Sequence, residues 1–144
     1  MGVSMIKMFR IDGIEAKRFI EPENAPREIR IDNNSSIISI AQVDANEVKI
    51  DFKFTITYSG IGVITFDGIL IYEGNAKEIM EEWKKKHRMP DNVAQEVHAT
   101  IINNCVIEGV VIAKEVRLPP PIPPPAGMMQ QKKGGKKSDV VGYA

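Results

Sequence analysis

The feature that most constrains the fold is a pair of adjacent segments, residues 48–58 and 63–73, each with the pattern of a long β-strand. In the first, apolar side chains occupy every second position from Val48 to Tyr58, and polar or charged residues stand between them. A period of two is typical of a half-buried antiparallel strand. The intervening Ser59-Gly60-Ile61-Gly62 indicates a turn. Together these residues predict a long β-hairpin.

The second strand of this hairpin carries apolar residues on both faces. One face holds Ile64, Phe66, Leu70 and Tyr72, and the other holds Val63, Ile69 and Ile71. The helices of a single chain can cover only one face of such a sheet. We therefore expect the other face to be an interface or a surface that binds a partner.

The elements around the hairpin predict an α+β fold. Residues 14–20 and 37–43 have strand character and precede the hairpin, so we expect a four-stranded antiparallel meander. After Gly74 the apolar period becomes helical, and Asn75 with Glu78 resembles a capping box. A second, long helix is expected from Asp91, as its N-cap, to Glu115.

The long helix is apolar around much of its circumference. Helices with apolar residues on all sides are usually buried on all sides. We expect this one to pack on its own sheet and on a second copy of the chain. The residues predicted for this homo-oligomer interface are Val97, Ile101, Ile102, Cys105 and Val106.

A proline-rich run, residues 118–125, follows the long helix. It predicts an extended polyproline segment, either a strap lying on the domain through Leu118 and Ile122 or a ligand for a partner. Residues 126–144 contain four lysines and one aspartate, and we expect this tail to be disordered. We therefore divide the chain into a domain at 1–125, which includes the strap, and a tail at 126–144.

Composition favours a cytoplasmic protein with one globular domain. The chain has 144 residues, 43% of them hydrophobic, and its 19 basic residues balance its 19 acidic ones. The single Cys105 cannot form an internal disulfide. No uninterrupted apolar run approaches the roughly 18 residues that span a bilayer. We expect no membrane insertion.

The sequence offers few groups for catalysis. His98 and Cys105 lie on one helical face but seven residues apart, too far to bind one metal ion. Gly60-Ile61-Gly62 joins two strands and is too short to hold a phosphate, and Ser35-Ser36 has no identifiable base. We predict no enzyme activity, no catalytic residues, no cofactor and no metal.

Several segments, in order, resemble the SecB family of export chaperones. Residues 19–26, Phe-Ile-Glu-Pro-Glu-Asn-Ala-Pro, are similar to the family's F-x-EPNAP segment with one inserted Glu. Glu47-Val48, Phe66-x-Gly68, Pro90 and the run Leu118 to Ile122 match later family features in position. The similarity spans residues 11–122. The family's aromatic FPYAR sequence and its final helix have no counterpart here.

The resemblance implies a ββββαα fold that assembles into oligomers and holds unfolded polypeptides in apolar grooves, with a link to protein export. The predicted polypeptide-binding groove consists of Ile64, Phe66, Leu70 and Tyr72 from the second hairpin strand, with Ile79, Met80 and Trp83 from the short helix. The alternative reading of these residues is that they form the core. The alternative function is a structural or ribosome-associated subunit whose basic tail contacts RNA phosphates.

Overall fold

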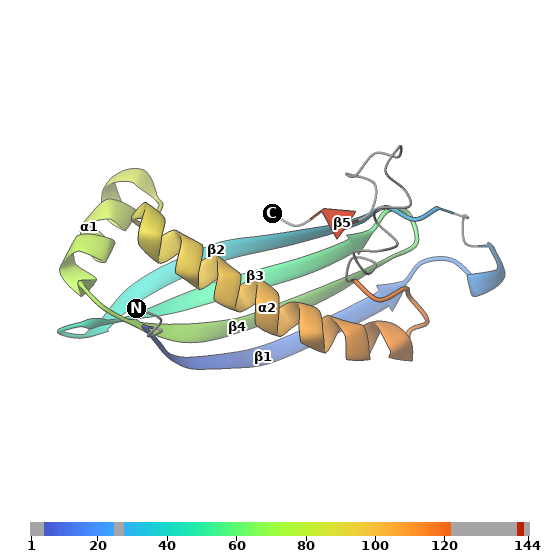
Figure 1. Ribbon diagram of the computed structural model, residues 1–144, viewed down its shortest axis with the longest axis horizontal. Coiled ribbons are helices and arrows are strands. Elements are labelled where there is room, and N and C mark those ends of the chain that lie inside the picture. The colour runs from blue at the N-terminus through green and yellow to red at the C-terminus, as the bar shows by residue number, and fades with distance from the viewer. Residues whose placement is uncertain (1–4, 25–27, 122–140, 143–144) are drawn as a thin grey trace, which may run out of the picture.

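A computed structural model describes residues 5–24, 28–121 and 141–142 (Figure 1). Two strands and a short 3-10 helix come first: β1 (Ile6–Arg18), η1 (Pro22–Asn24) and β2 (Ile31–Asp44). The hairpin strands β3 (Glu47–Tyr58) and β4 (Gly62–Glu73) follow, then the helices α1 (Ala76–Lys86) and α2 (Asp91–Glu115), and finally β5 (Val141–Gly142). The predicted α+β fold is confirmed, with a four-stranded antiparallel sheet followed by a short and a long helix.

The order of strands in the sheet differs from a simple meander. The order is β1-β4-β3-β2-β5, so β2, β3 and β4 form a meander while β1 pairs with β4. The link between β1 and β2 is long enough to cross from one edge of the sheet to the other. Because β4 would otherwise be an unpaired edge strand, β1 satisfies its second row of backbone groups.

Strand β2 is longer than its sequence pattern predicts. It begins at Ile31, although residues 32–36 are all polar and only residues 37–43 have strand character. Residues 31–37 nevertheless pair one by one with residues 52–58 of β3. The long apolar partner therefore sets the length of β2, because tertiary pairing outweighs local preference.

Both helices lie on one face of the sheet, where they form the core. Figure 1 shows α2 crossing the strands diagonally, from over β2 at its start to over β1 at its end. The residues of β3 that face α2 are almost fully inaccessible: Val48, Ile50, Phe52, Phe54, Ile56 and Tyr58. The predicted alternation along the hairpin is confirmed. Val63, Ile69 and Ile71 lie on the opposite face and are only half-buried.

The two helices begin differently. Asn75 caps α1 as expected, because its side-chain oxygen accepts a hydrogen bond from the backbone N–H of Glu78 at 3.2 Å. The predicted Asp91 cap of α2 is wrong. Pro90 is the N-cap and Asp91 is the first helical residue, with no side-chain cap bond. Pro90 still satisfies one helical N–H, because its carbonyl accepts from Ala94 at 2.9 Å.

The chain after α2 turns back onto the end of the sheet. Arg117 has a left-handed backbone (φ 57), and its carbonyl accepts a hydrogen bond from Arg18 Nη1 at 3.0 Å. Leu118 is 5% exposed, and Tyr58 Oη donates to the carbonyl of Pro119 at 2.6 Å. Residues 118–121 are thus held against the domain. The rest of the predicted strap, 122–125, lies outside the described residues.

Most of the predicted disordered tail, residues 126–140 and 143–144, also lies outside the described residues. Within it, however, Val141 and Gly142 form a short strand that pairs in parallel with Ile31 and Asp32 of β2. For these two residues the prediction of disorder is wrong. A two-residue strand has no sequence signature, because its partner rather than its composition creates it.

Helix α2 is long and apolar enough to cross a membrane by length and composition alone, with a mean hydropathy of 1.3. The core helix of a protein that never enters a membrane passes the same test. Here α2 packs its buried side on the sheet of its own domain.

Candidate binding site

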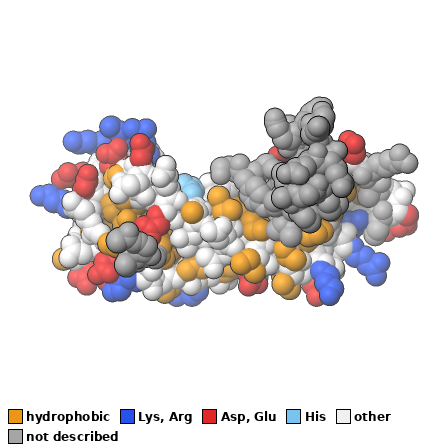
Figure 2. Space-filling model, in the orientation of Figure 1, with side chains coloured by type: hydrophobic (Ala, Val, Ile, Leu, Met, Phe, Trp, Pro, Cys, Tyr) orange, Lys and Arg blue, Asp and Glu red, His pale blue; other side chains and the backbone are white. Residues whose placement is uncertain are grey.

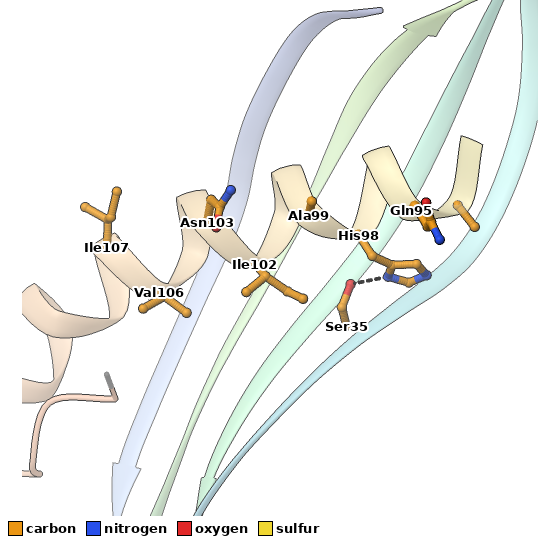
Figure 3. Close-up of a pocket in the computed structure, with 9 residues that line it drawn as sticks. Ser35, Gln95, His98, Ala99, Ile102, Asn103, Val106 and Ile107 are labelled. Carbon is orange, nitrogen blue, oxygen red and sulfur yellow. Dashed lines mark hydrogen bonds between the residues drawn. The ribbon is translucent and has the colours of Figure 1, made fainter. Parts of the chain in front are cut away.

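A pocket of about 930 Å³ opens between the outer side of α2 and strand β2 (Figure 3). Its described lining comes from α2 and from Ser35 of β2. Five lining residues are apolar, namely Ala94, Ala99, Ile102, Val106 and Ile107, and four are polar and uncharged at neutral pH, namely Ser35, Gln95, His98 and Asn103. A pocket of this size and character suits an uncharged, largely apolar group.

The pocket is open at the surface. Figure 3 shows His98, Ile102 and Val106 on one side of α2, whereas Asn103 and Ile107 lie on the opposite side of the helix. Ile107 is 65% exposed and Val111, one turn further, is 54% exposed. In Figure 2, hydrophobic side chains are visible along the middle of the face that carries α2. Exposed apolar side chains that are grouped in this way mark binding surfaces.

A single hydrogen bond joins the two walls of the pocket. Ser35 Oγ lies 2.7 Å from His98 Nδ1. Burial lowers the pKa of His98 from its usual 6.5, so the imidazole is neutral at pH 7. A neutral imidazole and a hydroxyl can each donate or accept. The pair can therefore bind α2 to β2 and still offer a second hydrogen bond to a neutral group in the pocket.

The outer edge of β2 runs beside this pocket. Ser59 N–H donates to the carbonyl of Arg30, which makes Arg30 and Ser59 a hydrogen-bonded pair of the β2–β3 ladder. Such pairs alternate in an antiparallel ladder. The backbone groups of Ile31, Asn33 and Ser35 therefore point away from β3, toward the outer edge. Among the described residues, only β5 pairs with this edge, at Ile31 and Asp32.

The side chain of Asn33 is an unsatisfied polar group next to Ser35. It is 5% exposed, and neither its Oδ1 nor its Nδ2 has a hydrogen-bond partner among the described residues. It lies on the same face of β2 as Ser35, two residues away along the strand. Buried amides usually have partners, because an unmade hydrogen bond costs about 1–3 kcal/mol. The amide of Asn33 therefore has one donor group and one acceptor group without a described partner.

The predicted groove residues occupy a different place. Ile64, Phe66, Leu70, Tyr72 and Ile79 are at most 5% exposed and belong to the core. A partner cannot reach them in this conformation, which corrects the assignment of an accessible groove to them. Met80 and Trp83 of α1 are only half-buried and pack against the core. For these two residues the binding role stays a prediction.

The predicted interface residues are also divided. Val97, Ile101 and Cys105 are fully inaccessible on the sheet side of α2, so they cannot contact a second copy, and Val106 is 8% exposed. Burial and the charge of Glu108 raise the pKa of the Cys105 thiol to about 12, which fits inert packing. Ile102 is half-buried and lines the pocket. The accessible apolar side of α2 instead carries Ile107 and Val111.

Sequence reasoning missed the two residues that join the pocket walls. Ser35 and His98 are 63 positions apart, and no local pattern connects them. Ile107 could have been found, because it continues the apolar circumference of α2 beyond the stripe that packs on the sheet. Within the described part of the chain, no group of three or more His, Cys, Asp or Glu residues could hold a metal ion.

No protein-family model, curated protein or solved structure matches this chain. The resemblance to the SecB family therefore stays a prediction.

Proposed function

We propose that this protein is a non-enzymatic holdase that binds extended apolar segments of unfolded polypeptides. The observation that carries the proposal is the open apolar pocket beside a strand edge that, among the described residues, is paired only at Ile31 and Asp32. A bound segment would add a strand to β2, with its backbone on the outward groups of Asn33 and Ser35. Its side chains on the helix side would enter the pocket. Peptide binding of this kind takes affinity from backbone pairing and specificity from the pocket.

The chemistry of the site fits unfolded chains rather than one fixed ligand. Backbone hydrogen bonds are the same for every sequence, so they do not select a particular client. None of the described residues that line the pocket is charged at neutral pH, so these residues disfavour charged side chains and reward apolar ones by about 25 cal/mol per Å² buried. The expected client is any extended segment with apolar residues at alternate positions.

The proposal includes a homo-oligomer, formed through the outer side of α2. Val111 is 54% exposed and lies one turn beyond the pocket residue Ile107, toward the C-terminal end of the helix. A second copy that packs on Val111 would leave the pocket accessible. Two pockets in one assembly would bind a long client at two points and raise its apparent affinity. A link to export is suggested only by the resemblance.

A peptide-binding measurement tests the proposal. The probe is a fluorescein-labelled peptide with alternating valine and threonine, titrated with the full chain and followed by anisotropy. Ile107→Asn should weaken binding about tenfold, equal to 1.4 kcal/mol, with little change in stability because Ile107 is 65% exposed. Val43→Asn is the matched control. Val43 is 50% exposed at the far end of β2, so its change should leave affinity unaltered.

Aggregation of a chemically denatured enzyme gives the second readout. The wild-type chain should suppress light scattering at a stoichiometric ratio without ATP, and Ile107→Asn should suppress it less than Val43→Asn does. If neither peptide binding nor suppression is detected for the wild-type chain at tens of micromolar, the holdase proposal is wrong.

A further inference from the structure

The outer edge of β2 already carries an extended segment, which belongs to the chain itself. Val141 pairs with Ile31 and Gly142 pairs with Asp32, both in parallel orientation. This is the same edge to which a client strand would be added. Competition between residues 141–142 and clients therefore rests on the proposed function. The pairing itself is independent of that function.

We propose that residues 141–142 are an internal ligand of the β2 edge and compete with client segments for it. Because Ile31 and Asn33 direct their backbone groups outward, both can bond to Gly142 of a parallel strand in which Val141 lies opposite Ile31. The N–H of Gly142 then donates to the carbonyl of Ile31, and the carbonyl of Gly142 accepts from Asn33. A client that extends along the edge past Ser35 toward Ile31 must displace these bonds.

The self-bound segment is short enough to be displaced. Its register covers two residues, whereas β2 continues for twelve more residues without a described partner on that edge. A longer client strand can make more backbone bonds and also fill the pocket. The internal segment makes few bonds, but it is tethered to the domain. A tethered ligand acts at an effective concentration in the millimolar range, which offsets its weak pairing. The tail therefore excludes short, weakly binding client segments from the β2 edge.

The pairing also defines the orientation of preferred clients. The parallel position at Ile31 and Asp32 is occupied by Val141 and Gly142, so this end of the edge pairs with a strand in parallel orientation. Glycine is unusual in a strand interior. A client with a larger residue at the second position and the same polarity should compete more strongly than the internal segment.

Substitutions at Gly142 test the contact in the full chain. Gly142→Pro removes the N–H that donates to Ile31, whereas Gly142→Ala keeps it and is the matched control. Hydrogen exchange followed by NMR should show faster exchange of the Ile31 and Asn33 amides in Gly142→Pro than in Gly142→Ala. The melting temperature should be equal in both variants. Unchanged exchange in Gly142→Pro overturns the proposal.

Competition supplies a second readout. A labelled synthetic peptide with the sequence of residues 137–144 should bind Gly142→Pro more tightly than Gly142→Ala, by about twofold to fivefold if the tether acts in the millimolar range. The valine–threonine probe should show a change in the same direction. Equal affinity of the 137–144 peptide for both variants overturns the internal-ligand proposal. Binding of that peptide without binding of the valine–threonine probe overturns the holdase proposal alone.

Discussion

Replacement of Leu118 by alanine should destabilise the domain strongly, although Leu118 lies after the last residue of α2. Its side chain is 5% exposed and approaches Gly62 at the start of β4. Truncation of a buried leucine typically costs about 2–5 kcal/mol, and a site at the end of the sheet can partly collapse, so we expect about 2–3 kcal/mol. In a domain of this size that corresponds to a fall in melting temperature of about 10 °C.

Thermal unfolding followed by circular dichroism would measure this effect. Pro120→Ala is the matched control, because Pro120 belongs to the same segment but is exposed. We expect its melting temperature to stay within about 2 °C of wild type, as is usual for surface substitutions. If Leu118→Ala and Pro120→Ala unfold at the same temperature, residues 118–121 do not contribute to the fold and the described packing of this segment is refuted.

Three further predictions concern pH, the thiol and assembly. Burial lowers the pKa of His98, so the unfolded state binds a proton more readily than the folded state; stability should therefore fall as pH decreases through and below 6.5, and urea titrations of His98→Gln should show a flatter pH dependence. Because burial raises the pKa of Cys105 to about 12, Ellman's reagent should react slowly with the native chain and quickly in denaturant. The homo-oligomer proposal predicts that Val111→Asp lowers the mass measured by light scattering, and a wild-type chain that is monomeric at tens of micromolar contradicts it.

Local patterns in the sequence predicted the elements well. The alternation from Val48 to Tyr58 and the helical stripe after Asn75 reflect burial within single elements, so they could be read without tertiary information. The place of β1 could not be predicted in the same way. A strand pattern indicates that a segment needs a partner, but not which of two free edges it will find.

The candidate site was predicted less well than the fold. An apolar face such as that of Ile64 and Phe66 has the same sequence pattern whether it forms a core or an open groove, and the structure shows that α2 covers it. The Ser35–His98 contact depends on the diagonal path of α2 over the sheet. No spacing in the sequence encodes that angle, so the pocket became visible only in three dimensions.

The pairing of β1 with β4 has a consequence for how the chain acquires its structure. Ile6 lies opposite Tyr72, and Arg18 lies opposite Gly62, so β1 cannot pair until β4, more than 40 residues later, has been synthesised. Contacts between residues so distant along the chain form slowly, because a long loop must close first. The hairpins of β2, β3 and β4 are local and can form earlier. The docking of β1 is therefore expected to limit the folding rate, and mutations in its ladder should slow folding more than mutations at the β3–β4 turn do.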